Sequence, residues 1–534
     1  MLKRMIMMLL TVSMLITGFT ACSSVSDTDK KGDDAKTSGI SSKADQTKKE
    51  DFSEEVKITM NVLYTEKNNI DSRYDFLRKK FNINFDLIAC SLNDIKEKSR
   101  VWIASGDMPE VMWSNMELLN ASELKDWAKS GMLKEIPDMS AYTNLKAIQD
   151  GIPSYKDLAV DGKNYFWLGG RGLEKLKGYA PEVYLYRKDW AKQLGMDKEE
   201  FTWDEMIALA KAFVEKDPGH NGSGKTIGMA AIAWAYPACS GLDRTSPQWD
   251  SFVKKDGQYV WGGALPETLE GVKEAKKLFD ENVFWKEQSI AKTFDGPSQF
   301  QAGQVGILYH NLFSNNVLTT VDGMEKAIPG IKIDDAVGIM KLKSPDGTYF
   351  NKEIDEWWGT TSFRSDINEK KMERFLAMQD WLNSEEGLTL RTYGLEGVDY
   401  NKNGDNYEML WDKNASGGFV SPYAPESDRI LNMFQLTEST NYTLPTVPDS
   451  AKGLMQQVLG SFNVSNPTVK IDDRKLKTFS APNKDKYNIA EETRTKIIEL
   501  IISSKNIEKD YKAWCDSMKP KIDPILKELN EGLK

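Results

Sequence analysis

Residues 219–226 carry a spacing that could bind phosphate. Their sequence, GHNGSGKT, matches the G-x-x-x-x-G-K-[ST] pattern of a phosphate-binding loop. Such a loop leaves a strand and opens a helix, so that backbone N–H groups at the helix start meet the phosphates. Here a predicted helix ends at Asp217-Pro218-Gly219, and Ile227-Gly228-Met229 has the character of a strand. Because this order is reversed, we predict that the loop binds no nucleotide.

The same loop contains oxygen donors that could hold calcium. Calcium takes six or more oxygen ligands, usually several carboxylates and a closing bidentate acid. Asp217 and Asn221 fit such a pattern. Gly219 stands where Asp or Asn is usual, and Gly228 stands where the closing Glu belongs. Asp217 and Asn221 are therefore weak calcium candidates, and we expect a metal-free turn and no cofactor.

Residue patterns typical of enzymes are sparse. The two histidines, His220 and His310, begin no H-E-x-x-H run, and no G-x-S-x-G elbow occurs. Carboxylate pairs for glycoside hydrolysis stay an open alternative, because Asp and Glu are plentiful and spacing in sequence does not specify a cleft. We expect a protein that is not an enzyme.

Tryptophan is abundant, with 15 in the chain. Sugar rings pack their apolar C–H faces on aromatic planes, while carboxylate, amide and Arg groups hold the hydroxyls. The chain contains this mixture, which permits a saccharide pocket without specifying one. For any one aromatic side chain, a place in the core is an equally open interpretation.

The N-terminus has the pattern of an export signal. A short basic region precedes an apolar stretch at residues 5–16, which is too short for an ordinary membrane span. Residues 1–21 are therefore predicted to be a signal peptide. The small residues before Cys22 resemble a bacterial lipobox, although Phe19 stands where Leu is usual. We expect Cys22 to become the acylated first residue of a lipoprotein, with palmitate among its lipid chains.

Residues 22–51 are predicted to hold the acylated cysteine and a disordered tether. Between residues 23 and 50 there is no aromatic side chain, and acidic and basic residues balance. Such a segment cannot bury enough apolar surface to become ordered. It would hold a folded body away from the membrane while the lipid anchors the chain.

The remaining body is long enough for two or more lobes, since it has about 480 residues. Its cysteines, Cys90, Cys239 and Cys515, are scattered and indicate no disulfide framework or metal site. The net charge of −10 argues against nucleic acid as a partner. The fold must therefore depend on its apolar cores.

The body opens with a predicted α/β lobe. Apolar residues alternate across residues 56–62, which predicts a strand. A helix, strand, helix and strand are then predicted at residues 74–81, 83–87, 95–104 and 110–113. This order favours parallel pairing. Ligands lie outside the carboxyl ends of such strands, so Trp113 to Asn115 should face a cleft.

Further elements follow along the body. A strand begins near Tyr184, and Thr202 and Glu205 have the spacing of a capping box, which predicts a helix start. A helix from about Glu369 is predicted to close at Ser384 to Gly387.

Five blocks follow one another along the body: Tyr184 to Leu194, Thr202 to Glu205, Phe300 to Leu308, Trp381 to Gly387, and Tyr393 to Gly397. With Cys22 and the Ser105 to Pro109 loop, they span nearly the whole mature chain. No single block is specific, but their order and spacing are. Taken in order, they resemble the family 1 extracellular solute-binding proteins, especially the long lipoprotein members of Gram-positive bacteria.

The resemblance implies an α/β fold of two hinge-linked lobes, the type II periplasmic-binding-protein-like fold, with a ligand cleft between them. The first lobe would comprise residues 52–178 plus about 336–390, and the second residues 179–335 plus about 391–534. The chain would cross between lobes near Gly178 to Pro181 and return near Asp335 to Ile339.

The resemblance also implies a function. The chain would capture a carbohydrate, and an oligosaccharide is the form we expect. It would deliver this ligand to the permease subunits of an ABC importer, as a monomer anchored at the extracellular face of the cell membrane. In the better-known sugar receptors an aromatic side chain after the strand at Gly303 to Leu308 stacks on the ligand, and Phe313 occupies that place. Candidate contacts are Asp107, Trp113, Asn115, Tyr165, Trp167, Trp234, Tyr236, Asn311, Phe313, Trp357, Trp358, Tyr393 and Glu396.

Two other classes of protein remain open at this point. A surface polysaccharide-degrading enzyme would need paired acid and base groups in the cleft. A non-transport lipoprotein, such as a sensor or adhesin, would need no permease partner. Within the receptor interpretation, an oligopeptide ligand is also open.

Overall fold

The computed structural model describes most of the chain beyond residue 51. The predicted signal peptide, Cys22 and the tether lie outside the described residues. Among the described residues, no helix combines the length and the apolar character needed to cross a bilayer. The described residues are 52–63, 71–91, 94–115, 121–170, 182–232, 240–292, 294–311, 314–343, 357–404, 406–413, 419–423, 430–431, 447, 449–462 and 474–533.

The first sheet joins strands that are far apart in the sequence. Its order in the described part of the chain is β2-β1-β3-β11-β4. β1 is parallel to β2 and β3, whereas β11 runs antiparallel between β3 and β4. The predicted opening of alternating strands and helices is thus confirmed. The elements are β1 (Val56–Leu63), α1 (Ser72–Phe81), β2 (Ile83–Cys90), α2 (Ile95–Ser105), β3 (Val111–Asn115), α3 (Ala121–Lys129), η1 (Met139–Ala141), α4 (Thr143–Asp150), α5 (Ser154–Leu158), β4 (Trp167–Gly170), β11 (Trp357–Phe363) and α14 (Glu369–Leu382).

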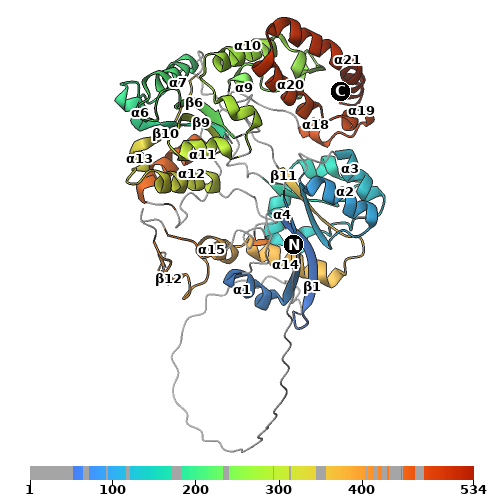
Figure 1. The fold of residues 1–534 in the computed structure, drawn as a ribbon. Coiled ribbons are helices and arrows are strands. Elements are labelled where there is room, and N and C mark those ends of the chain that lie inside the picture. Colours follow the sequence, from blue (N-terminus) through green and yellow to red (C-terminus); the bar gives the residue numbers. More distant parts are fainter. Residues whose placement is uncertain are drawn as a thin grey trace, which may run out of the picture. The chain divides into compact units, whose positions relative to one another are not determined.

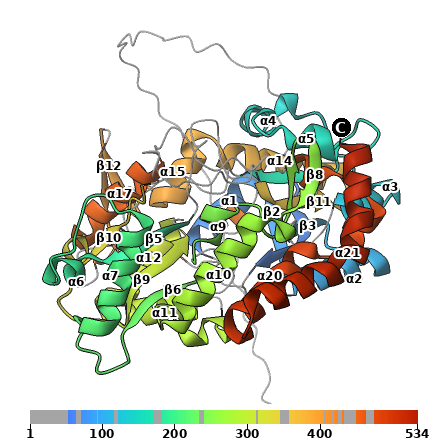
Figure 2. The same ribbon diagram turned by 90° about the horizontal axis from the view of Figure 1, so that it is seen from above.

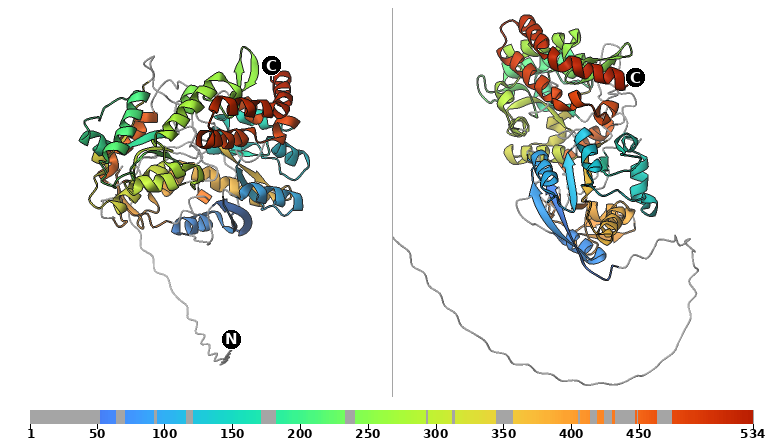
Figure 3. Two further views of the ribbon diagram at one scale, coloured as in Figure 1. Left: turned by 45° about the horizontal axis from the view of Figure 1, so that its top comes forward. Right: turned by 90° about the vertical axis from the view of Figure 1, so that its right-hand side faces the viewer.

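Apolar alternation explains why these strands share one core. Ile58 and Met60 are fully buried, as period-two patterning requires of the covered face of a strand. Phe375 of α14 packs against both Phe85 and Phe363, with ring centroids 6.2 and 5.9 Å apart. A helix from late in the chain therefore covers strands from its beginning, and the orange α14 lies beside the blue strands in Figure 3.

The second sheet has the order β10-β5-β9-β6 in the described residues. β5 is antiparallel to β9 and β10, and β6 is parallel to β9. The predicted capping box is confirmed, because Thr202 and Glu205 bond each other's backbone at the start of α7. The elements are β5 (Glu182–Arg187), α6 (Lys188–Gln193), α7 (Trp203–Lys216), β6 (Ile227–Ala231), η5 (Lys286–Ile290), α11 (Asp295–Gln301), β9 (Val305–Asn311), α12 (Ser314–Ala327), α13 (Ile333–Ala336), β10 (Val337–Ile339), η6 (Asp449–Ala451) and α17 (Lys452–Phe462).

A helical layer near the C-terminus has a core of its own. α20 and α21 pack on α10, as Figures 1 and 2 show. Tyr511 and Trp514 of α21 form a buried aromatic group with Trp261 of β8. The elements are α9 (Leu242–Thr245), β7 (Phe252–Lys255), β8 (Gln258–Trp261), η4 (Gly262–Ala264), α10 (Pro266–Asp280), α18 (Arg474–Thr478), α19 (Pro482–Lys486), α20 (Ile489–Ser503) and α21 (Ile507–Gly532).

The sheets correct the predicted return between lobes. Val337–Ile339 pairs with β5, so the expected crossing at Asp335 to Ile339 still belongs to the second sheet. The first sheet resumes at Trp357. The earlier change of sheet lies between Gly170 and Glu182, and residues 178–181 are outside the described part. The return was predicted at β10 in place of β11, because both are buried strands and apolar patterning does not show which sheet each one joins.

The helix predicted to close at Ser384 to Gly387 is also corrected. α14 ends at Leu382, and α15 (Glu385–Tyr393) begins directly afterwards. The Ser384 hydroxyl accepts from the Gly387 N–H and acts as the N-cap of this new helix. The hairpin of β12 (Tyr400–Asn403) and β13 (Asn406–Met409) follows. The first core includes Ile430 and Leu431, which the prediction had assigned to the second lobe.

Candidate functional site

The first sheet has a switch point between β1 and β3. From β1 the chain goes to β2 on one side, and it then returns past β1 to β3 on the other. In open α/β sheets, ligands bind in the crevice outside the carboxyl ends of the strands at such a point. β1 ends at Leu63 and β3 ends at Asn115. The carboxyl edge near these residues is therefore the candidate ligand site of the first sheet.

Trp113 lies at this edge. It is half-buried and packs against the first core. Its indole lies directly against Gly359 of β11, where an added Cβ would come within 2.9 Å of Nε1. No other residue could give the ring this contact without moving it. Asn115 ends β3 opposite Gly359, and its side chain is outside the described part of the structure.

Two of the predicted contacts lie in the core. Trp167 is fully buried and Trp357 is 7% exposed, and both belong to the first core. Trp167 packs edge-on against Tyr155, whose hydroxyl accepts from the Leu168 N–H. Their burial corrects the expectation that these two indoles contact a ligand. Tyr165 is half-buried against the same core.

Asp107 lies at the wrong end of β3. It is exposed in the loop after α2, and four residues later β3 begins at Val111. The carboxyl edge of a parallel strand is at its other end, beyond Asn115. The structure therefore corrects the placement of Asp107 with the ligand contacts.

The second sheet brings another set of predicted residues to one edge. β6 and β9 are parallel, so their ends at Ala231 and Asn311 lie at the same edge. The predicted contacts Trp234 and Tyr236 follow β6, and Phe313 follows β9. These three residues, and the side chains of Asn311 and Trp358, lie outside the described part of the chain.

Tyr393, the last residue of α15, and Glu396 belong to a separate segment that contains a group of tyrosines. Tyr393 stacks on Tyr407 of β13 with ring centroids 4.1 Å apart, while Glu396 is exposed. The segment is organised by Asp399, which is 3% exposed and which sequence reasoning missed. Its carboxylate accepts from the Leu395 N–H at 2.6 Å, from Trp411 Nε1–H at 2.9 Å and from the Tyr423 hydroxyl.

Asn61 is a second residue that sequence reasoning missed. Strand alternation places its side chain on the other face of β1 from the buried apolar residues, a face that is ordinarily exposed to solvent. In the structure it is fully buried and hydrogen-bonded to the backbone of Trp113. An Asn between two apolar residues near the carboxyl end of a predicted strand is the signal that could have identified it.

The loop at residues 217–226 closes on its own side chains. The Asp217 carboxylate accepts from the Thr226 hydroxyl and from the N–H groups of Asn221 and Gly222. These donors, the Thr226 hydroxyl first, lower the pKa of Asp217. The loop lies between α7 and β6, the reverse of a phosphate-binding loop. The prediction against that motif therefore has a topological basis.

The donor set of this loop does not fit calcium. Asp217 is its one carboxylate between residues 217 and 228. A closing Glu at position 228 is excluded, because an added Cβ would meet the Val283 and Ala210 carbonyl oxygens at 2.7 and 2.9 Å. Among the described residues, no group of three or more His, Cys, Asp or Glu side chains is placed to hold a metal.

Calcium and EDTA are therefore both expected to leave the melting temperature of the protein unchanged, because internal donors already satisfy Asp217. Thr226→Val, which removes one of these donors, should lower the melting temperature in either condition. Differential scanning calorimetry would check both results. A rise of the melting temperature with calcium concentration would contradict this prediction.

Comparison with known proteins supports this architecture. Alginate-binding protein AlgQ2, solved without calcium ion, superposes with a TM-score of 0.64 at 17% identity, covering 89% of this chain and 97% of that one. The Streptococcus pneumoniae ABC-transporter substrate-binding protein FusA, in complex with kestose, gives 0.61 at 18% identity, covering 89% and 98%. The chain has the two-lobed α/β fold of these proteins, which confirms the predicted fold class.

Two curated relatives are more similar in sequence. The polygalacturonan/rhamnogalacturonan-binding protein YtcQ of Bacillus subtilis (strain 168) is 25% identical over 354 residues, which are 65% of this chain and 67% of that protein. Lipoprotein LipO of the same organism is 26% identical over 317 residues, 57% of this chain and 59% of LipO. The family model of the bacterial extracellular solute-binding proteins matches residues 80–386, more than half of the 534 residues. The chain therefore belongs to the bacterial extracellular solute-binding protein family.

Proposed function

We propose that this protein is a lipid-anchored extracellular receptor that captures an oligosaccharide and delivers it to the permease subunits of an ABC importer. Family membership supports the binding role. The names of YtcQ and of FusA in complex with kestose support a carbohydrate ligand. No reaction is part of this proposal, since the family and its neighbours are binding proteins.

The observation that carries the proposal is the position of Trp113 at the β1–β3 switch point. A half-buried indole held at the carboxyl edge of a sheet offers the apolar plane on which a sugar ring stacks. The second sheet ends at Ala231 and Asn311, after which Trp234, Tyr236 and Phe313 follow in the sequence. Ligand binding by these residues from both sheets would favour a closed state of the lobes.

Lipid anchoring at Cys22 is part of the proposal. The sequence supports it through the apolar stretch and small residues before Cys22, and the relative LipO is a lipoprotein. The receptor would act as a monomer at the extracellular face of the cell membrane. The tether would leave its body free to reach a permease.

Sheet and core membership supports revised lobe boundaries. We propose that the first lobe comprises residues 52–170 and 357–431, which share the first sheet and its core. The second lobe would comprise residues 182–343 and 447–462. The helices of residues 474–533 would extend the second lobe, because they share a core with α10 and the β7–β8 hairpin.

A thermal-shift screen tests the ligand class. The full chain, purified in detergent, would be heated with galacturonate oligomers, neutral fructans, other oligosaccharides and short peptides. An oligosaccharide at a hundredfold its dissociation constant is expected to stabilise the folded protein by about 2.7 kcal/mol, because it binds only the folded form.

The fate of the ligand separates the alternatives. Recovery of a chemically unchanged oligosaccharide would support a receptor, whereas cleavage of the oligosaccharide would support a polysaccharide-degrading enzyme. A response to peptides alone would contradict the carbohydrate proposal. Reconstitution with a candidate permease would then test delivery.

A further inference from the structure

The ladder between β1 and β3 is unusually short. β1 pairs with β2 along its whole length, from Val56 opposite Ile83 to Leu63 opposite Cys90. With β3 it shares the register pair Met60 and Val111. Beyond this pair, towards the carboxyl edge, a side chain takes the place of the backbone ladder.

That side chain is Asn61. Its Nδ2 donates to the Trp113 carbonyl at 2.9 Å, and its Oδ1 accepts from the Trp113 N–H at 2.8 Å. The carboxamide thus bonds both backbone groups of one residue, as a neighbouring peptide group would. Asn61 is fully buried, so losing either bond would leave a buried polar group without its partner.

Cys90 orients the carboxamide from the other side. Asn61 Nδ2 also donates to Cys90 Sγ at 3.5 Å, and the Cys90 thiol donates to the Val62 carbonyl at 3.3 Å. Burial raises the pKa of this thiol, which therefore keeps its proton and remains a donor. The three strands β2, β1 and β3 are in this way linked at their carboxyl ends through one amide.

This link lies at the carboxyl edge, where open α/β sheets place their ligand crevice. The β1–β3 gap is the switch point, and the indole of Trp113 lies against Gly359 on the next strand. Because Trp113 turns both its N–H and its carbonyl towards Asn61, the carboxamide determines where the backbone that carries the indole lies.

We propose that Asn61 is a positioning residue of the ligand site, which holds the backbone of Trp113 so that its indole is ready to stack on a saccharide ring. The inference rests on the proposed function. Asn61 itself is buried and contacts no ligand, so its effect on affinity passes through Trp113.

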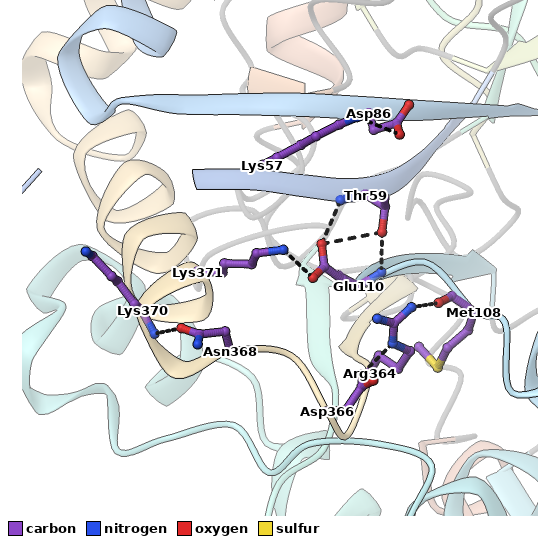
Figure 4. A network of polar contacts seen from close by, with 10 residues as sticks. All are labelled: Lys57, Thr59, Asp86, Met108, Glu110, Arg364, Asp366, Asn368, Lys370 and Lys371. Carbon is purple, nitrogen blue, oxygen red and sulfur yellow. Dashed lines mark hydrogen bonds and ion pairs between the residues drawn. The ribbon is translucent and has the colours of Figure 1, made fainter. Parts of the chain in front are cut away.

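The opposite flank of the Met60–Val111 pair offers a matched control, drawn in Figure 4. There the Thr59 N–H donates to Glu110 Oε2 at 2.9 Å, and the Glu110 N–H donates to Thr59 Oγ1 at 3.0 Å. Lys371 pairs with Glu110 Oε1 at 2.6 Å. This link joins β1 through side chains to the residue that precedes β3, but it lies at the amino edge, away from the crevice.

The experiment compares Asn61→Ala, Thr59→Val and Trp113→Ala in the full chain with the oligosaccharide found in the screen. Isothermal titration calorimetry is expected to show affinity about tenfold lower for Asn61→Ala, the equivalent of one lost hydrogen bond. Thr59→Val should bind within about twofold of the wild type. Trp113→Ala should lose at least as much affinity as Asn61→Ala.

Asn61→Asp serves as the near-isosteric variant that keeps the side-chain volume. The carboxyl group that it introduces can donate to the Trp113 carbonyl only when protonated. The affinity of this variant is therefore expected to rise as the pH falls from about 8 to about 5, while the wild-type affinity changes little. Near-UV circular dichroism would confirm the fold of each variant.

Two outcomes would overturn the inference, and they are distinct. If a folded Asn61 variant binds with wild-type affinity at every pH, Asn61 has no positioning role and the proposed function stands. If the wild-type chain binds no saccharide at all, the proposed function falls and this inference falls with it.

Discussion

Replacement of Trp167 by alanine is expected to lower the free energy of unfolding by about 3–5 kcal/mol, the range for large aromatic residues truncated in a core. Trp167 is fully buried in the core of the first sheet and packs against Tyr155. Removing the indole leaves a cavity that β4 and α5 cannot fill without moving. This loss is a large part of the total stability of about 5–15 kcal/mol that a typical domain has.

Urea unfolding followed by far-UV circular dichroism would measure the loss as a lower midpoint. Trp113→Ala is the control, because a half-buried side chain at the sheet edge leaves a smaller cavity. The two variants should affect different quantities. Trp167→Ala should lower the stability and keep the ligand affinity of the folded protein, whereas Trp113→Ala should lower the ligand affinity. A stable Trp167→Ala protein that no longer binds ligand would contradict the assignment of this residue to the core.

Replacement of Asp399 by alanine is expected to have the second large effect, a destabilisation of about 3 kcal/mol or more. The carboxylate is buried and accepts from three donors: the Leu395 N–H, the Trp411 indole N–H and the Tyr423 hydroxyl. Each donor left buried without an acceptor costs about 1–3 kcal/mol. The Arg73 guanidinium, which stacks 3.6 Å from the centre of the Tyr423 ring, would also lose its support.

Tyr423→Phe is the matched control, since it removes one donor and leaves Asp399 with the other two. We expect it to cost about 1 kcal/mol. Asn in place of Asp399 should also be harmful, because in either orientation its amide NH₂ would face an N–H donor, that of Leu395 or that of the Trp411 indole. Hydrogen exchange at the Leu395 amide would report the local effect. If Asp399→Ala and Tyr423→Phe were equally stable, Asp399 would not organise this segment.

The first lobe shows how far periodicity alone can predict structure. Alternation from residue 56 to 62 and the helical spacing before Phe81 predicted β1 and α1, because both elements have one buried face that repeats with their own period. The capping box at Thr202 and Glu205 predicted the start of α7 for a similar reason, since its hydrogen bonds join residues three apart.

The candidate site was predictable only in part. Trp113 was identified through a rule about the carboxyl ends of parallel strands, which needs only the order of the elements. Trp167 and Asp107 were named as candidate contacts without such a rule, and the structure placed one in the core and the other at the opposite end of β3. Burial is not visible in a run of aromatic letters, whereas the position of Asp107 before the strand predicted at residues 110–113 was already visible in the sequence.

Local patterns in the sequence by themselves therefore determined the α/β class, the positions of many strands and helices, the predicted export signal and tether, and membership of the solute-binding family. All of these depend on residues close together in the chain or on the order of blocks along it. The tertiary structure alone decided that β11 enters the first sheet between β3 and β4, that Asp399 gathers three donors, and that Asn61 bonds the backbone of Trp113. These contacts join residues from 4 positions apart, as Leu395 and Asp399 are, to 252 positions apart, as Val111 and Phe363 are. The longer polar contacts form because the surrounding core excludes water and leaves a buried polar group no other partner.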